Sequence, residues 1–222
     1  MLPVLLIHAA GGAARNFGSV LRRLEGARAI DLPGHGRAGG EAPRTIAASA
    51  EIALAGAPEG PFIAAGHSMG GAVALTLATL APDRVRGVVL IATGARLQMS
   101  RAVAEKARND FEGFLAALQA TGSPIMTIEA LRQAGQETVA RDLEACVPWD
   151  GLALAPRVKA PALLLAGERD RTTPPALVRE LAAALPAGAR VVVLPGAGHV
   201  LPVEKPDDVA REIEAFRREV DS

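Results

Sequence analysis

The stretch FIAAGHSMGGAVAL, residues 62–75, places one serine among three glycines, between an apolar run and a run with helical character. Glycine weakens regular structure, by about 1 kcal/mol in the interior of a helix. Three glycines so close together therefore indicate a backbone that passes through a space too narrow for side chains. The position of the serine at the centre of this cluster decides how the rest of the chain is interpreted.

The cluster contains the pattern G-x-S-x-G, formed by Gly66, Ser68 and Gly70. The apolar run before it predicts a strand and the run from Met69 predicts a helix, which is the strand–turn–helix context of a nucleophile elbow. A serine on so sharp a turn projects outward, and the start of the helix favours developing negative charge. The pattern predicts Ser68 as a nucleophile; the alternative is a tight turn in which the serine has no role.

The chain of 222 residues is long enough for one domain with a sizeable core. Its 24 basic side chains balance 24 acidic ones, which gives no indication of a nucleic acid or a membrane surface as partner. Cys146 is the single cysteine, so a reducing, cytoplasmic location is expected. The apolar start MLPVLLIH lacks a basic region and a cleavage site and is too short to span a membrane, so we interpret it as a buried strand.

Apolar runs alternate with helical patterns along the chain. The runs are continuous rather than alternating, as in strands buried on both faces of a parallel sheet. The predicted strands are Pro3–His8, Arg28–Leu32, Pro61–Gly66, Arg86–Ala92, Pro161–Gly167 and Ala189–Leu194. The predicted helices lie near Arg15–Glu25, Arg44–Ala57, Met69–Leu80, Pro175–Leu185 and Pro206–Val220. This order predicts an α/β fold with a doubly wound, mostly parallel sheet of about six strands.

A long segment between the fourth and fifth predicted strands, Thr93 to Ala160, interrupts this alternation. A crossover needs only about a dozen residues. The insert carries two apolar series at helical spacing: Val103, Ala107, Phe111, Phe114 and Leu118, then Ile128, Leu131, Val139 and Leu143. It is either an enlarged helical layer or a lid over a site at the carboxyl ends of the strands. We predict a lid over residues 97–158 and a core of residues 1–96 and 159–222.

The large apolar side chains of the insert are candidates for the wall of a substrate pocket, because a helical pair lying alone cannot bury all of them. These predicted pocket residues are Phe111, Phe114, Leu118, Met126 and Trp149. The alternative is that they anchor the lid to the core. Few aromatic residues and many alanines suggest a modest pocket for small or medium acyl groups.

A nucleophilic serine needs a base, and the chain has four histidines. His199 lies in LPGAGHVLP, after the last predicted strand, on a loop whose glycines let it bend back over the sheet. His8, His35 and His67 are better explained as hydrogen-bonding partners that brace loops. His199 is therefore the predicted base.

The acid that orients the base has two candidate positions, each after a predicted strand. The strand that ends at Ala92 is followed by TGARLQ, which holds no carboxylate. The strand that ends near Gly167 is followed by Glu168 and Asp170. Asp170 lies farther into the loop, so we predict it as the acid, with Glu168 bracing the turn. The order Ser, Asp, His is that of an α/β-hydrolase.

The chain resembles the α/β-hydrolase fold superfamily over nearly its whole length. The matching pieces are VLLIHAAGG, DLPGHGR, GHSMGG, GERDRTTPP and PGAGHVLPVEKPDDV. Together they look like the lidded carboxylesterases and enol-lactonases of that superfamily. The resemblance implies a catalytic triad of Ser68, Asp170 and His199.

The resemblance also implies an oxyanion hole made by the backbone N–H groups of Ala10 and Met69. Two features depart from the family pattern. His8 is followed by Ala9 where the family usually has glycine. The family usually has eight strands with one antiparallel, whereas six parallel strands are expected from Pro3 onward.

The chemistry implied is acyl transfer from an ester to water, without a metal or other cofactor. A serine nucleophile disfavours haloalkane dehalogenase and epoxide hydrolase chemistry, for which the family uses aspartate. The alternatives are lactone opening, carbon–carbon bond hydrolysis or perhydrolysis on the same triad, and a ligand-binding sensor on a hydrolase scaffold. The expected partner is a small-molecule ester or lactone, with no nucleic acid and no membrane, and the chain is expected to be a monomer or a homodimer.

Overall fold

A single sheet of six strands forms the centre of the molecule. The structure is a computed structural model that describes residues 1–221. The strands are β1 (Val4–Ile7), β2 (Ala27–Ile30), β3 (Phe62–His67), β4 (Val85–Ile91), β5 (Ala162–Gly167) and β6 (Ala189–Leu194). Their order across the sheet is β2-β1-β3-β4-β5-β6, and every pairing is parallel. The predicted fold class and the six parallel strands are confirmed within the described residues.

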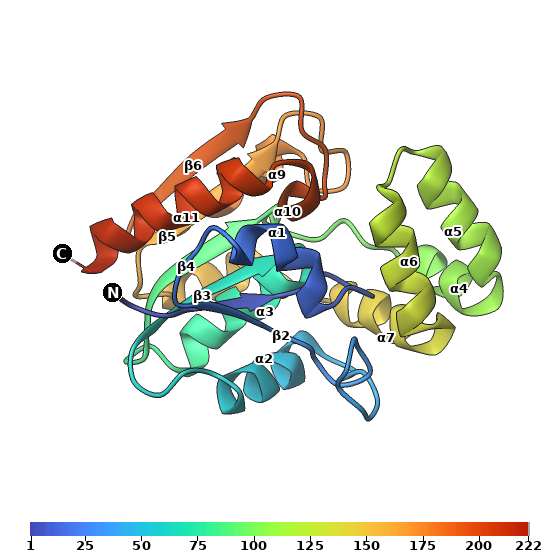
Figure 1. Cartoon of the computed structure of the whole chain (residues 1–222), viewed down its shortest axis with the longest axis horizontal. Coiled ribbons are helices and arrows are strands. Elements are labelled where there is room, and N and C mark those ends of the chain that lie inside the picture. The colour runs from blue at the N-terminus through green and yellow to red at the C-terminus, as the bar shows by residue number, and fades with distance from the viewer. Residues whose placement is uncertain (222) are drawn as a thin grey trace.

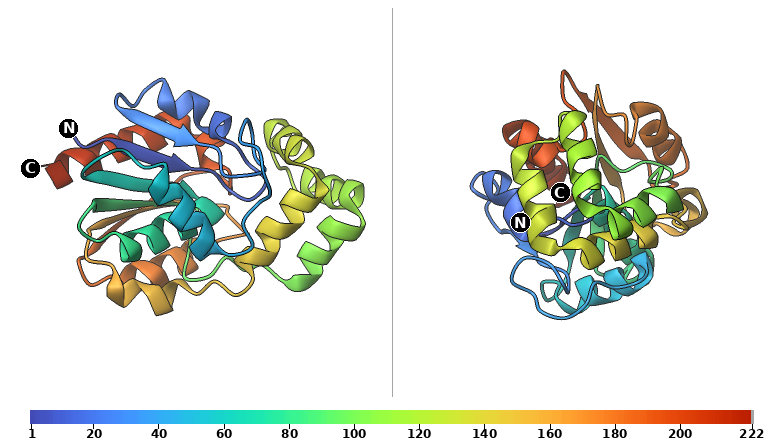
Figure 2. Two further views of the ribbon diagram at one scale, coloured as in Figure 1. Left: turned by 90° about the horizontal axis from the view of Figure 1, so that it is seen from below. Right: turned by 90° about the vertical axis from the view of Figure 1, so that its right-hand side faces the viewer.

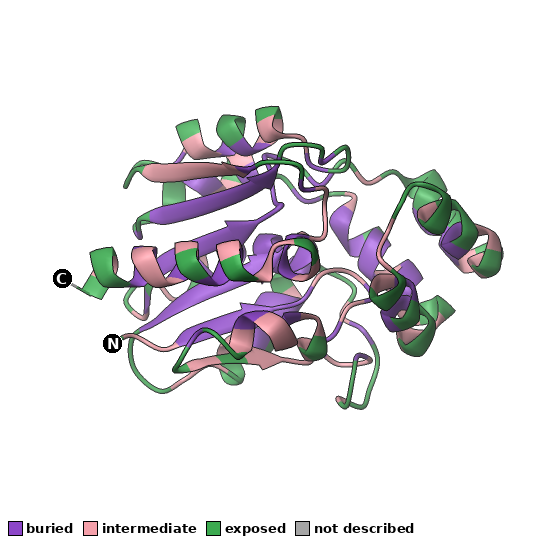
Figure 3. Ribbon diagram, turned by 45° about the horizontal axis from the view of Figure 1, so that its top comes forward, coloured by how far each residue is buried: buried purple, intermediate pink, exposed green. Residues whose placement is uncertain are grey.

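Helices cover both faces of the sheet (Figure 1). Alternate residues of each strand point to opposite faces, so Leu5 and Ile7 belong to one apolar cluster and Val4 and Leu6 to the other. The first face is covered by α2 (Ile46–Ala55), α3 (Met69–Leu80), α8 (Gly151–Leu154), η2 (Ala155–Arg157) and α9 (Pro175–Ala183). The second is covered by η1 (Ala14–Phe17), α1 (Gly18–Leu21), α10 (Leu201–Glu204) and α11 (Pro206–Asp221). In Figure 3 the strands are largely buried, and exposed residues lie on the outer sides of the helices.

Four helices of the insert lie beyond the end of the sheet toward which the strands point (Figures 1 and 2). They are α4 (Arg101–Asn109), α5 (Phe111–Ala120), α6 (Ile125–Ala134) and α7 (Gln136–Cys146), and we call them the cap helices. They enclose an apolar cluster of their own, which is built from Ala104, Ala107, Phe114, Leu115, Ile128, Leu131, Val139 and Leu143. Both chain ends lie at the opposite end of the molecule.

The insert is more finely divided than the two apolar series predict, because each series is split into two helices. Asp110 ends α4 in a non-helical conformation, and its side chain accepts a hydrogen bond from the Gly113 N–H to begin α5. Gly135, at φ 84°, separates α6 from α7. The predicted helix Arg15–Glu25 is likewise wrong in its extent, since η1 and α1 together end at Leu21.

In residues 1–221, no helix combines the length and the apolar character needed to cross a membrane.

Candidate active site

Ser68 lies at the turn between β3 and α3, where the strand–turn–helix pattern predicts it. Its backbone has φ 53° and ψ −115°, a strained conformation for a residue other than glycine. The surrounding structure holds this conformation: the Ser68 N–H donates to the Ile91 carbonyl at 2.8 Å, and the Thr93 hydroxyl donates to the Ser68 carbonyl at 2.9 Å. The Ser68 hydroxyl is thereby projected beyond the end of the sheet.

The glycines on either side of Ser68 are required by close backbone approach. A Cβ atom on Gly66 would lie 2.0 Å from the carbonyl oxygen of Gly70, and one on Gly70 would lie 2.1 Å from that of Ile7. Both contacts are with backbone atoms, which cannot rotate away. The turn therefore leaves no room for side chains at these positions, as the glycine cluster predicts.

Substitution of Gly66 by alanine is expected to destabilise the protein by about 3 kcal/mol or more, at the upper end of what overpacking costs, and to lower activity with it. Gly39→Ala is the matched control, because a Cβ atom there meets nothing within 4 Å and the backbone is not left-handed. Urea unfolding of both variants checks this. Equal unfolding free energies for Gly66→Ala and wild type would show that the turn is not crowded.

His199 is held over Ser68 by a braced loop between β6 and α10. Its Nε2 lies 3.0 Å from the Ser68 Oγ. Glu204 accepts hydrogen bonds from the Gly198 and Val200 N–H groups on either side of the histidine, at 2.6 and 2.7 Å. Glu168 accepts from the Gly196 N–H at 2.8 Å, so it braces the loop that carries His199 rather than the turn after β5, where the sequence predicts it to act.

Asp170 completes a hydrogen-bonded chain of three side chains that begins at Ser68. Its Oδ2 accepts from the His199 Nδ1–H at 2.8 Å and from the Thr173 hydroxyl at 2.8 Å. Its Oδ1 accepts from the Thr172 and Thr173 N–H groups at 2.8 and 2.9 Å. Burial alone would raise the pKa of Asp170, but the hydrogen bond and charge of His199 and the donors of Thr173 outweigh burial and lower it. The carboxylate is therefore ionised and fixed toward the imidazole.

The other three histidines are buried and bonded to backbone groups, as the loop-bracing interpretation expects. His67 Nε2–H donates to the His199 carbonyl at 2.8 Å. His8 Nδ1–H donates to the Ala9 carbonyl, and its Nε2 accepts from the Leu32 N–H. Burial, with the charge of a neighbouring imidazole, lowers the pKa of His8 to about 4 and that of His67 to about 3. Both rings are therefore neutral at neutral pH.

These lowered values predict a stability that falls as the pH falls. At about pH 6 to 5 the unfolded chain protonates a histidine whose ordinary pKa is 6.5, whereas the folded chain keeps His67 neutral. Each such histidine makes the unfolding free energy fall by about 1.4 kcal/mol per pH unit. His67→Gln keeps a donor for the His199 carbonyl. In urea unfolding it should reduce the slope of unfolding free energy against pH by about 1.4 kcal/mol per pH unit, the contribution of one histidine. An unchanged slope would contradict the assignment of His67 as neutral.

The loop after β1 forms a tight turn that presents the Ala10 N–H. The Gly12 N–H donates to the Ala9 carbonyl at 2.9 Å, and Gly11, at φ 60°, takes the left-handed position of this turn. Ala9 is not left-handed, so alanine fits where the family usually has glycine. The Met69 N–H begins α3 and has no acceptor within the helix. Both amides predicted to form the oxyanion hole thus belong to segments that border Ser68.

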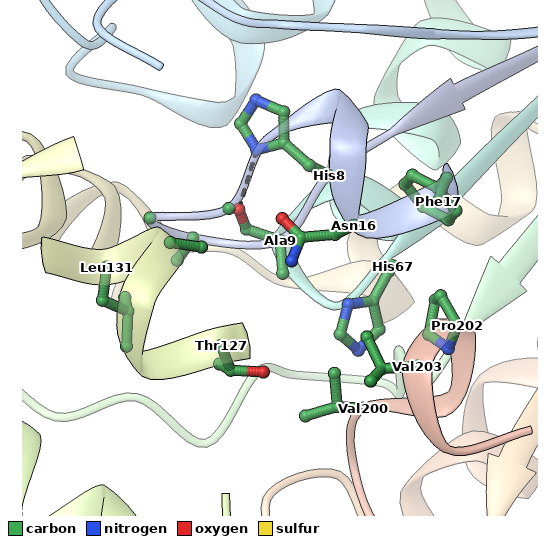
Figure 4. Close-up of a pocket in the computed structure, with 14 residues that line it drawn as sticks. His8, Ala9, Asn16, Phe17, His67, Thr127, Leu131, Val200, Pro202 and Val203 are labelled. Atoms are coloured by element: carbon green, nitrogen blue, oxygen red, sulfur yellow. Dashed lines mark hydrogen bonds between the residues drawn. The ribbon is translucent and has the colours of Figure 1, made fainter. Parts of the chain in front are cut away.

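A small pocket of about 30 Å³ lies beside this turn and is partly open to solvent (Figure 4). Its wall comes from the β1 loop, from η1, from His67, from the loop and short helix after His199, and from one cap helix, α6. The lining residues are His8, Ala9, Ala10, Gly11, Gly12, Asn16, Phe17, His67, Thr127, Ala130, Leu131, Val200, Pro202 and Val203. The side-chain oxygen of Thr127 is buried and has no hydrogen-bond partner among the described residues.

The five side chains predicted for the pocket lie elsewhere. Phe114 belongs to the cap's own cluster, and Phe111 and Leu118 pack against it. Met126 is exposed, and Trp149 is buried in the main core. Helical periodicity identified the apolar face of the insert, but that face is turned inward between the cap helices. The contribution of α6 through Thr127 and Leu131 carries no signal in the sequence apart from the helical spacing of Leu131.

Within the described part of the chain, no group of three or more His, Cys, Asp or Glu side chains is arranged to hold a metal ion.

Comparison with known proteins places this geometry in a family. Residues 4–212 match the model of the alpha/beta hydrolase family. The chain is similar to the pimeloyl-[acyl-carrier protein] methyl ester esterase of Neisseria meningitidis serogroup B (strain MC58), with 31% identity over 229 residues, covering 88% of this chain and 85% of the relative. The protein of the same name from Chromobacterium violaceum is 32% identical over 206 residues, covering 83% and 80%.

Two solved structures share the fold over almost the whole chain. A thermophilic esterase from Thermogutta terrifontis, with malate bound, superimposes with a TM-score of 0.81 at 29% identity, covering 100% of this chain and 91% of the other. The enol-lactonase from Burkholderia xenovorans LB400 superimposes with a TM-score of 0.85 at 25% identity, covering 98% and 92%.

Proposed function

Because the chain belongs to the alpha/beta hydrolase family, in which it is similar to esterases, we propose that it is a serine esterase that cleaves carboxylic esters of small or medium acyl groups. The observation that carries the proposal is the hydrogen-bonded chain from Ser68 through His199 to Asp170 at the end of the sheet. The proposed catalytic triad consists of these three residues.

The proposed acylation step uses this hydrogen-bonded chain. Ser68 Oγ attacks the ester carbonyl carbon while His199 Nε2 takes its proton. Asp170 holds the Nδ1–H, so the imidazole keeps its accepting nitrogen toward the serine and its positive charge is balanced once protonated. The Ala10 and Met69 N–H groups stabilise the oxyanion, each donor contributing ~3 kcal/mol.

Collapse of the tetrahedral intermediate breaks the bond to the alcohol, which leaves with the proton from His199 Nε2. Water then enters, gives a proton to His199 and attacks the acyl-enzyme carbonyl. The second intermediate expels Ser68 Oγ, which recovers its proton from the imidazole. The products are the carboxylic acid and the alcohol, and the triad returns to its starting state.

We propose that residues 97–158 act as a lid on a core of residues 1–96 and 159–222. Support comes from the position of the cap helices and from α6, which closes one side of the pocket. The Thr127 hydroxyl is free to hydrogen-bond a bound substrate. We further propose a small-molecule substrate, a cytoplasmic location and a monomer or homodimer, without nucleic acid or membrane partners.

A lactone is the second candidate substrate class, favoured by the similarity to the Burkholderia enol-lactonase. The test is a panel of p-nitrophenyl esters of increasing acyl length, methyl esters including dimethyl pimelate, and lactones. Steady turnover of short or medium esters above lactones supports the proposal. If lactones are turned over faster than esters, the protein is a lactonase instead. If compounds of the panel bind but none is turned over, the protein is a ligand-binding sensor instead.

Leu131→Ala is expected to shift the preferred acyl length upward, because removing this side chain enlarges the pocket where α6 meets the β1 loop. Kcat/KM across the ester panel measures the shift. Met126→Ala is the matched control from the same helix, since Met126 is half exposed and does not line the pocket. If Leu131→Ala leaves the dependence of kcat/KM on acyl length unchanged, this pocket does not select the acyl group.

A further inference from the structure

One buried contact joins the cap to the loop that carries the proposed oxyanion donor Ala10. Asp142 lies on α7 and is 2% exposed, yet its Oδ2 accepts a hydrogen bond from the Gly11 N–H at 2.7 Å. The two residues are 131 positions apart in the sequence. A buried carboxylate is costly unless it is fully bonded, so this arrangement needs a compensating partner.

His35 is that partner. Its Nε2–H donates to the same Asp142 oxygen at 2.8 Å, and its Nδ1–H donates to the Pro33 carbonyl at 3.0 Å. A carbonyl and a carboxylate only accept hydrogen bonds, so these two contacts favour the charged imidazole with protons on both ring nitrogens. Burial opposes the charge, but the hydrogen bond and charge of Asp142 outweigh it and raise the pKa of His35. The neighbouring His8 ring, 4.5 Å away between centroids, is neutral.

The cap also presses against the turn sterically. A Cβ atom on Gly11 would lie 2.4 Å from Leu131 Cδ2 of α6 and 2.9 Å from Val139 Cγ2 of α7. Gly11 therefore satisfies two demands at once, a left-handed backbone and close contact with two cap helices. The turn is held in place both by apolar packing against Leu131 and Val139 and by the hydrogen bond to the Asp142 carboxylate.

We infer that Asp142 is a positioning residue for the oxyanion hole: by holding the Gly11 N–H, it orients the turn that aims the Ala10 N–H at the substrate carbonyl beside Ser68. A peptide plane is rigid, and the hydrogen bond from the Gly12 N–H to the Ala9 carbonyl fixes the other end of the turn. The oxyanion hole is thus complete only when the cap is docked on the core. This inference rests on the proposed esterase function.

The test compares D142A with E41Q. Glu41 also joins the cap to the core, through Arg141 at 2.6 Å on the same helix, but its contact is exposed and does not reach the turn. D142A is expected to lower kcat for a short p-nitrophenyl ester by about 100-fold, the scale of a misplacement near 1 Å, with KM nearly unchanged. The affinity for a trifluoromethyl ketone, whose serine adduct carries an oxyanion, should fall by a similar factor. E41Q should match wild type in both.

D142A leaves the His35 charge buried without its partner, which is strongly destabilising. The double variant D142A/H35L removes both charges and carries the test if D142A does not fold; its kcat and ketone affinity should fall in the same way. Wild-type values in folded D142A/H35L, or a raised KM with unchanged kcat, would overturn the inference while leaving the esterase proposal intact. A wild-type protein that turns over no ester and does not bind the ketone would overturn both.

Discussion

Substitution of Ser68 by alanine is expected to lower kcat for ester hydrolysis by ~10⁴- to 10⁶-fold, the range of a triad knockout. The hydroxyl that this change removes lies 3.0 Å from His199 Nε2 and is the proposed nucleophile. Because the members of a catalytic triad act as a unit, His199→Ala should cost almost as much if the proposed triad is right. Steady-state hydrolysis of the best p-nitrophenyl ester measures both.

The fold should survive the change, since Ser68 is held through its backbone N–H and carbonyl rather than through its hydroxyl. Circular dichroism and the urea midpoint of Ser68→Ala should therefore match those of wild type. Ser100→Ala, which removes only an exposed helix cap at the start of α4, serves as the matched control and should keep full activity. Full activity in folded Ser68→Ala would end the serine esterase proposal.

Substitution of Asp170 by asparagine is expected to lower kcat by ~10⁴-fold, as the equivalent change does in the well-studied serine protease triad. The asparagine oxygen must keep accepting the Thr172 and Thr173 N–H groups, so the new NH₂ group faces His199 Nδ1. The imidazole then accepts at Nδ1 and carries its proton at Nε2. A protonated Nε2 cannot take the proton of Ser68.

Glu168→Gln is the control for Asp170→Asn, because Glu168 is the other carboxylate of the same loop. It accepts from the Gly196 N–H, which a glutamine oxygen can also bond. Its kcat should stay close to that of wild type. A large loss in Glu168→Gln together with near-normal activity in Asp170→Asn would move the acid to Glu168.

The sheet and the three triad candidates could be predicted from the sequence because each depends on short-range signals. Continuous apolar runs mark buried parallel strands, and parallel strands bring their carboxyl ends to one edge of the sheet. Ser68 follows β3 directly, and Asp170 and His199 lie in the loops after β5 and β6. Their convergence is therefore a consequence of topology, and the structure brings them within hydrogen-bonding distance.

The pocket could not be predicted in the same way, because it depends on how the cap packs on the core. Apolar spacing shows that Phe114 lies on the buried face of its helix. It does not show whether that face packs in the cap's own cluster or lines the pocket near Ser68. The breaks at Asp110 and Gly135, which turn two predicted series into four helices, decide that question. The Asp142 contact with Gly11 likewise depends on how α7 of the cap packs on the β1 loop, and no motif or strand end in the sequence marks Asp142.

Covalent labelling with a fluorophosphonate shows whether Ser68 is an activated nucleophile. The protein should lose activity in step with incorporation of one label, and peptide mass spectrometry should place that label on Ser68 alone among the six serines of the chain. Ser68→Ala should not be labelled, and His199→Ala should be labelled far more slowly. Folded wild-type protein that takes up no label, or carries it on another serine, would show that Ser68 is not the activated nucleophile.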